Sequence, residues 1–256
     1  DVCSSDLEED TMDMTTPVIL LHAFPLNASM WKPQLPVLGD RTVLTPSFPG
    51  FGGRPVTEAD LDAFAETILK DMAPAGISRA VVVGLSMGGY VAFRLHARAP
   101  ERIAGLVLAD TRAGADDEGA RAKRTDQAAR ARREGVGWLE EALLPALLGD
   151  TTSRERPEVV DTVRAMMAEG DREGVARALE AMRERPDSTP ELERIQVPTL
   201  VLVGGEDTLT PEGEARIMAD AIPGAGLEIL PGAGHLSNLE APEAFNESLM
   251  RFLGGG

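Results

Sequence analysis

The segment Gly84-Leu85-Ser86-Met87-Gly88 holds a serine in a setting that suits a nucleophile. An apolar run at residues 80–83 precedes it, and residues 89–96 have the pattern of a helix. On a sharp turn between a strand and a helix, a serine hydroxyl points out of the sheet, and flanking glycines leave room for the turn. The amino terminus of the helix also stabilises negative charge that develops nearby. We therefore predict that Ser86 is a catalytic nucleophile.

A serine nucleophile needs a base that takes its proton, and histidine has a suitable pKa. The chain has three histidines, of which only His235 lies on a glycine-rich loop after the last predicted strand. His22 ends a predicted strand and His96 lies within the helix after the serine, so both are predicted to be structural. We expect His235 to be the general base.

A carboxylate orients such a histidine and stabilises its protonated form. Asp207 follows the apolar run at residues 199–203 and is the preferred candidate. Its neighbour Glu206, and Asp110 at the end of an earlier predicted strand, are the alternatives. The expected order along the chain is serine, aspartate, histidine.

Several motifs resemble those of the α/β-hydrolase family, and together they span nearly the whole chain from residue 17 to residue 253. In that family the serine, the acid and the histidine follow one another in the order seen here. Besides the serine turn, they are the oxyanion loop (residues 20–25), the turn after the next strand (46–52), the strand end that carries the acid (202–207) and the histidine segment (232–242). The resemblance implies an oxyanion hole formed by the backbone N–H groups of Phe24 and Met87, with Ala23 where the family most often has glycine. Some relatives carry the acid at the position of Asp110.

The composition is typical of a globular enzyme. The chain has 256 residues, 43% of them hydrophobic, which is enough for a large packed core. The formal net charge of −17 argues against nucleic acids and anionic membrane surfaces as partners. No apolar stretch is long enough to cross a bilayer. Cys3 is the only cysteine, so no intramolecular disulfide is expected, and a cytoplasmic location is predicted. No metal or organic cofactor is expected, because the histidines lack ligand spacing and the glycines near Ser86 form no phosphate-binding pattern.

The amino-terminal segment differs from the rest of the chain. Residues 1–13 are acidic, have no helical or strand periodicity, and contain no apolar segment of the kind found in signal peptides. We expect a disordered or non-native tail, with Met12 or Met14 as the natural start. The antiparallel hairpin that is common in the family before the oxyanion-loop strand is therefore not expected.

Short apolar runs bounded by turn residues predict strands that are buried on both faces. They lie at residues 18–21, 42–44, 80–83, 105–109, 199–203 and, more weakly, 227–230. Amphipathic segments such as 61–72 and 245–253 predict helices between and after them. The pattern predicts an α/β fold with a doubly wound, mostly parallel sheet of about six strands. Residues 14–111 and 196–256 would form this core.

Residues 112–195 interrupt the alternation, since they contain almost no β-branched apolar run. Helices are predicted over 117–134, 137–148, 157–168 and 172–184. The family resemblance implies that this segment is an inserted helical cap, which would roof the active site. Trp138 and Met167 are the residues predicted to line the substrate pocket, whereas most other apolar side chains of the cap are expected to hold its helices together.

With the resemblance, these features predict a serine hydrolase that cleaves small, mostly apolar carboxylic esters or lactones through an acyl-enzyme on Ser86. The motifs look most like those of bacterial esterases and of members similar to 3-oxoadipate enol-lactonase. A cofactor-free perhydrolase or a C–C bond hydrolase with the same catalytic residues remains open. A non-catalytic ligand receptor on the same fold is also open, although a receptor would not need the serine, aspartate and histidine together.

Overall fold

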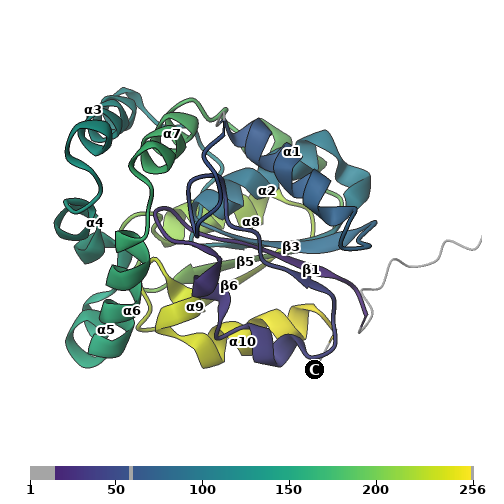
Figure 1. Ribbon diagram of the computed structural model, residues 1–256. Coiled ribbons are helices and arrows are strands. Elements are labelled where there is room, and N and C mark those ends of the chain that lie inside the picture. Colours follow the sequence, from purple (N-terminus) through teal and green to yellow (C-terminus); the bar gives the residue numbers. More distant parts are fainter. Residues whose placement is uncertain (1–14, 58–59, 255–256) are drawn as a thin grey trace, which may run out of the picture.

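The computed structural model describes residues 15–57 and 60–254, so the expected tail at residues 1–13 lies outside the described part. Within that part, one six-stranded sheet has the order β2-β1-β3-β4-β5-β6, and all neighbouring strands run parallel. Helices cover both faces of the sheet (Figure 1). The doubly wound α/β fold that the sequence predicts is confirmed.

The strands coincide with the apolar runs of the sequence. Their bounds are β1 (Val18–Leu21), β2 (Val43–Leu44), β3 (Ala80–Leu85), β4 (Ile103–Ala109), β5 (Thr199–Gly204) and β6 (Gly226–Leu230). The four central strands are almost completely buried, because helices pack on both of their faces. The edge strands β2 and β6 are more exposed, which for β6 explains the weaker signal in the sequence.

Helices lie on the two faces according to the direction of their connections. One face carries α1 (Leu61–Met72), α2 (Met87–Arg98) and α8 (Glu212–Ala221), and the other carries α9 (Ser237–Glu240) and α10 (Pro242–Phe252) (Figure 1). The first three link strands in the direction from β2 to β6, and right-handed crossovers place such helices on one side. The short 3₁₀ helices are η1 (Ala28–Trp31), η2 (Leu35–Leu38), η3 (Pro100–Arg102) and η4 (Thr189–Arg194).

The chain between β4 and β5 contains α3 (Glu118–Glu134), α4 (Leu139–Leu147), α5 (Asp150–Glu155), α6 (Pro157–Ala168) and α7 (Arg172–Arg183). We call α3–α7 the inserted helices, and they lie beyond the carboxyl ends of the strands (Figure 1). Four of them match the helices predicted in this segment to within two residues at either end. The fifth, α5, has no counterpart among the predictions.

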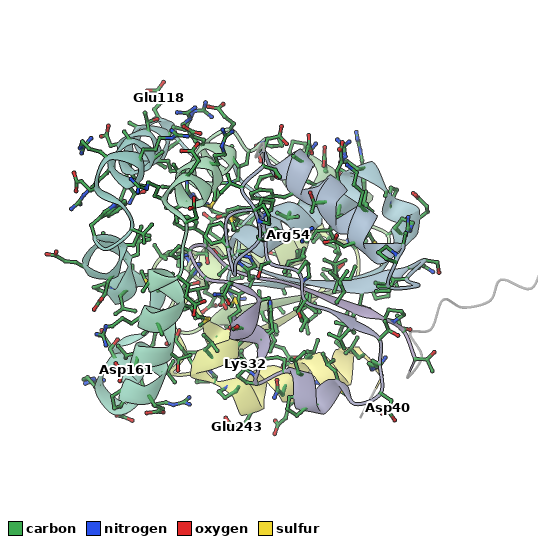
Figure 2. The ribbon with its side chains drawn as sticks, viewed as in Figure 1. Lys32, Asp40, Arg54, Glu118, Asp161 and Glu243 are labelled. Atoms are coloured by element: carbon green, nitrogen blue, oxygen red, sulfur yellow. The ribbon has the colours of Figure 1, made fainter. Side chains whose placement is uncertain are left out.

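Charged side chains cover the outer faces of the helices, as Glu118 and Asp161 on the inserted helices and Glu243 on α10 illustrate in Figure 2. Many of them form ion pairs, and Arg132 of α3 bonds both Glu173 and Glu180 of α7. Each exposed pair of this kind contributes little stability, about 1 kcal/mol or less. None of the helices in residues 15–57 and 60–254 has the length and apolar character that a membrane crossing requires.

Candidate active site

Ser86 occupies a strained turn between β3 and α2. Its φ of 55° is positive, which is uncommon for a residue with a side chain and is typical of functional sites. Two bonds hold the turn against β4 and the chain after it. The N–H of Ser86 donates to the carbonyl of Ala109 at 3.0 Å, and the hydroxyl of Thr111 donates to the carbonyl of Ser86 at 2.8 Å. The hydroxyl of Ser86 is thereby presented at the carboxyl edge of the sheet.

The glycines on either side of Ser86 are sterically required. A Cβ on Gly84 would collide with the backbone of Gly88, and a Cβ on Gly88 would collide with the backbone of Leu21 in β1. In both cases the obstacle is main chain rather than a movable side chain, so the turn tolerates no larger residue at these positions. The spacing seen in the sequence therefore has a direct structural cause.

The structure brings Ser86, His235 and Asp207 together, although they come from remote parts of the chain. Nε2 of His235 lies 2.8 Å from the Oγ of Ser86, and Nδ1 of His235 lies 2.8 Å from Oδ2 of Asp207. His235 and Asp207 are almost completely buried, with 3% and 5% of their surfaces exposed. Both distances are those of good hydrogen bonds, so Nε2 can take the proton of Ser86 while Asp207 orients the imidazole ring.

The carboxylate of Asp207 is fixed in its orientation by the turn that follows β5. Its Oδ1 accepts from the backbone N–H groups of Leu209 and Thr210 at 2.8 and 3.0 Å. The hydroxyl of Thr210 donates to Oδ2 at 2.6 Å. Burial alone would raise the pKa of Asp207, but the bonds from His235 and Thr210 outweigh it and the pKa is lowered. Asp207 is therefore ionised at neutral pH.

The loop that carries His235 is held by two buried carboxylates. Glu240 accepts from the N–H of Leu236 at 2.9 Å, and Asp110 accepts from the N–H of Ser237 at 3.1 Å. Burial lowers the pKa of His235, but the hydrogen bond and charge of Asp207 raise it more, so the net shift is upward. The paired imidazole therefore holds a proton more readily than a free one.

The two alternative acids have other partners. Asp110 is fully buried and bonds the N–H of Gly204 as well as Ser237, which ties the ends of β4 and β5 to the histidine loop. Burial and the nearby charge of Asp207 raise the pKa of Asp110 to about 8. Glu206 turns towards the inserted helices, where it accepts from the N–H of Thr151 at 2.9 Å. Neither carboxylate bonds the ring of His235.

The other two histidines have structural positions. Nε2 of His22 accepts from the N–H of Phe48 at 2.9 Å, while Nδ1 lies 2.9 Å from the carbonyl of Ala23. Burial lowers the pKa of His22 to about 4, so the ring is neutral and Nδ1 is the donor. His96 lies on α2 at a separate surface groove beside Glu191.

Phe24 follows β1, and Met87 begins α2 directly after Ser86. Among the hydrogen bonds of the described residues, neither backbone N–H donates to a protein acceptor. Phe24 lines the same cavity as Ser86. The two donors that the family resemblance implies for an oxyanion hole are thus available to a bound molecule.

A cavity of about 220 Å³ opens beside Ser86 and His235. Its apolar lining comes from the oxyanion loop, the inserted helices and the turn after β5, and consists of Phe24, Leu143, Leu147, Leu179, Met182 and Leu209. Its charged lining consists of Arg112, Asp116, Lys123 and Arg124. The volume suits a small molecule, and the two kinds of lining suit one with an apolar and a polar part.

The pocket prediction for Trp138 and Met167 was wrong, because neither residue lines this cavity. The indole N–H of Trp138 donates to the carbonyl of Gly135 at 2.9 Å, and the guanidinium of Arg130 stacks on its ring. Met167 is buried on α6. Helical spacing identified the buried faces of the inserted helices, but it cannot tell a face that packs on a neighbour from one that faces a cavity.

The charged lining residues were not among the predicted site residues: Arg112 and Asp116 precede the helix predicted over 117–134, and Lys123 and Arg124 lie within it. Arg112 and Asp116 lie in the connection between β4 and α3, so their spacing of four residues is not a helical one and no local pattern indicates their pairing. Within residues 15–57 and 60–254 there is no group of three or more His, Cys, Asp or Glu side chains that could hold a metal ion.

Comparisons with known proteins identify the family to which the chain belongs. A model of the alpha/beta hydrolase family matches residues 18–248. A thermophilic esterase from Thermogutta terrifontis, solved with malate bound, superposes with a TM-score of 0.91 at 40% identity over 93% of this chain and 89% of that one. The enol-lactonase from Burkholderia xenovorans LB400 gives a TM-score of 0.85 at 30% identity over 94% and 92% of the two chains. The 3-oxoadipate enol-lactonase 2 of Acinetobacter baylyi is 28% identical over 91% of this chain and 86% of its own length. This chain belongs to the alpha/beta hydrolase family, and its relatives support a hydrolytic activity.

Proposed function

We propose that this protein is a serine hydrolase that cleaves small carboxylic esters or lactones through an acyl-enzyme on Ser86. The observation that carries the proposal is the hydrogen-bonded row from Ser86 through His235 to Asp207 at the edge of a small cavity. The similarity to esterases and enol-lactonases supports the same chemistry.

In the first step the hydroxyl of Ser86 attacks the ester carbonyl while Nε2 of His235 takes its proton. This requires the neutral imidazole to carry its own proton on Nδ1, from which it donates a hydrogen bond to Oδ2 of Asp207. Asp207 also stabilises the imidazolium that forms, because an ionised carboxylate lies 2.8 Å from Nδ1. The N–H groups of Phe24 and Met87 would stabilise the oxyanion of the tetrahedral intermediate.

His235 next returns the proton to the leaving oxygen, and the alcohol departs, or the lactone ring opens. Water then enters, loses a proton to His235 and attacks the acyl-enzyme, which releases the acid and restores Ser86. The apolar lining of the cavity favours a short hydrocarbon portion, since its volume of about 220 Å³ leaves little room for a long chain.

The test is a comparison of Ser86→Ala with the wild type on phenyl acetate and a small lactone. The variant should lose at least about a thousandfold in kcat/KM while keeping its melting temperature. Ser153→Ala is the matched control, because it makes the same chemical change on an exposed residue of α5. Undiminished turnover by Ser86→Ala would reject the proposal. Shifts in melting temperature with ligands but no turnover by wild-type protein would favour a receptor instead.

A further inference from the structure

One wall of the cavity at Ser86 is positively charged, in a protein whose formal net charge is −17. Arg112, Lys123 and Arg124 line this wall, and Asp116 is the one carboxylate in the lining. The whole chain has 42 Asp and Glu residues against 25 Lys and Arg residues, and charged side chains of both signs project outward from the helices (Figure 2). The wall draws on α3, a helix with more basic than acidic residues, so the positive charge is local to this part of an otherwise acidic chain.

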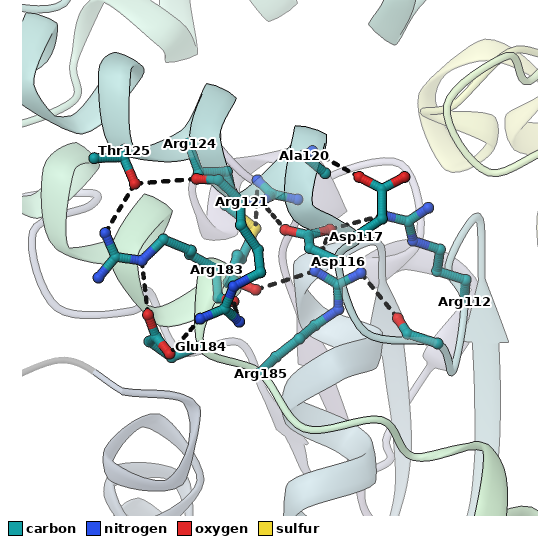
Figure 3. A network of polar contacts seen from close by, with 12 residues as sticks. Arg112, Asp116, Asp117, Ala120, Arg121, Arg124, Thr125, Arg183, Glu184 and Arg185 are labelled. Carbon is teal, nitrogen blue, oxygen red and sulfur yellow. Dashed lines mark hydrogen bonds and ion pairs between the residues drawn. The ribbon is translucent and has the colours of Figure 1, made fainter.

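Three arginines converge on Asp116 (Figure 3). Arg112 and Arg185 bond its Oδ1 at 2.8 and 2.7 Å, and Arg124 bonds its Oδ2. Burial alone would raise the pKa of Asp116, but the bonds and charges of Arg124 and Arg185 hold it below its usual value. One ionised carboxylate compensates one guanidinium, so this cluster keeps two uncompensated positive charges.

Nearby acidic residues do not cancel this excess. Glu184 bonds Arg121 and Arg183, which lie outside the cavity lining (Figure 3). Asp117 caps the amino terminus of α3 by accepting from the N–H of Ala120. Glu214 of α8 acts on Arg112 only through its charge, without an ion pair among the described residues.

Two of the lining cations also keep donors free. The Nε of Arg112 is buried and has no hydrogen-bond partner among the described residues. Lys123 is exposed at the cavity and forms no ion pair in the part of the chain that the structure describes. A buried guanidinium N–H without an acceptor costs free energy unless a ligand supplies one. Arg185 also has a buried Nε without a partner among the described residues, but it lies outside the cavity lining, where it bonds Asp116 and stacks on the ring of Tyr90.

We propose that the wall formed by Arg112, Lys123 and Arg124 binds a carboxylate of the substrate, so that the preferred substrates are half-esters or lactones carrying a second, ionised carboxylate. This inference rests on the proposed function and narrows its substrate class. The planar fork of arginine matches the two oxygens of a carboxylate, and such charge-assisted bonds are strong when partly shielded from water. The apolar lining would hold the hydrocarbon between the two carbonyl groups.

The first test compares neutral and charged members of matched substrate pairs. Phenyl hydrogen glutarate and its carboxamide analogue place the group on the acyl side, and 4-carboxybenzyl and 4-carbamoylbenzyl acetate place it on the alcohol side. In at least one pair, the carboxylate should be preferred by about 10-fold to 100-fold in kcat/KM. Equal or better hydrolysis of both neutral members would overturn the proposal.

The second test removes the charges. Arg124→Gln should reduce the preference by about tenfold, mainly through KM, and Lys123→Gln by a smaller factor. Lys123→Glu, at an exposed residue without an ion pair, tests the same wall if Arg124→Gln disturbs folding. Arg121→Gln is the matched control, because it removes one positive charge from the same helix outside the cavity and should leave the preference unchanged. An unchanged preference in Arg124→Gln and Lys123→Glu would contradict the assignment.

A third measurement separates this inference from the proposed mechanism. Glutarate should bind to Ser86→Ala protein in isothermal titration calorimetry, and the added Arg124→Gln or Lys123→Glu change should weaken binding at least about fivefold. If Ser86→Ala retained activity, the mechanism would fail while glutarate binding still supported the cationic wall. Absence of glutarate binding to folded Ser86→Ala protein would refute the carboxylate site and leave the mechanism standing.

Discussion

Replacing Asp207 by asparagine should disable the enzyme while preserving its shape. Oδ1 of Asp207 accepts two backbone N–H groups, from Leu209 and Thr210. The asparagine oxygen must take this place, because its NH₂ group would otherwise meet two donors. The NH₂ group is then directed at Nδ1 of His235.

This geometry fixes the wrong tautomer of the imidazole. With an NH₂ donor opposite, Nδ1 of His235 becomes an acceptor, and the ring proton moves to Nε2. Nε2 lies 2.8 Å from the hydroxyl of Ser86 and can no longer take its proton. Such a change lowers kcat by about 10⁴-fold in serine enzymes that use the same arrangement, or about 5 kcal/mol of transition-state stabilisation.

The assay is steady-state hydrolysis of phenyl acetate, with circular dichroism and urea unfolding to establish that the variant is folded. Asp110→Asn is the matched control, since this carboxyl bonds Gly204 and Ser237 rather than His235. It should cost about 1–2 kcal/mol of stability but no more than about tenfold in kcat. Retention of more than about a tenth of wild-type activity by Asp207→Asn, or a larger loss in Asp110→Asn, would refute the reasoning about which acid serves His235.

Four further outcomes follow from the same contacts. The rate should fall on acidification through a pKa above 6.5, because the base must be neutral and Asp207 raises the pKa of His235; a titration of kcat/KM that breaks at about pH 6 or below would contradict this. Because Asp207 raises the pKa of His235, the protonated imidazole also contributes to the free energy of unfolding. This contribution is fully present below about pH 6.5 and is lost as the pH rises through the raised pKa of His235. Gly88→Ala should destabilise the fold by at least about 2 kcal/mol in urea unfolding, since the new Cβ meets the backbone of Leu21; wild-type stability would argue against the tight turn. His22→Ala should cost about 2–3 kcal/mol in the same assay, because the carbonyl of Ala23 in the oxyanion loop and the N–H of Phe48 in the turn after β2 both lose their partner; a change within error would show that neither segment needs the imidazole ring.

The sequence predicts the sheet well because each central strand is an apolar run that must be buried on both faces. The meeting of Ser86, Asp207 and His235 also follows from local pattern. Ser86 directly follows β3, and the other two lie on the segments after β5 and β6. The carboxyl ends of parallel strands meet at one edge, so residues placed there converge whatever their separation in sequence.

What the sequence does not predict depends on contacts between remote segments. The helix α5 is short and polar, and its N–H of Thr151 is satisfied by Glu206 from beyond β5. The charged wall arises because Arg185 joins residues near the start of the inserted segment around the buried Asp116. Trp138 was predicted to line the substrate pocket, yet its ring is already covered by the guanidinium of Arg130. Hydrophobic periodicity indicates which face of a helix is buried, but it does not indicate which residues pack against that face.

The most direct test of the account is to trap the covalent intermediate. Wild-type protein mixed with phenyl hydrogen glutarate or phenyl acetate, quenched in acid within the first turnovers and digested, should carry the acyl mass on the peptide that contains Ser86, and Ser86→Ala protein should carry none. An acyl group found on a different residue, or full turnover with no acylated peptide in either protein, would contradict the central claim.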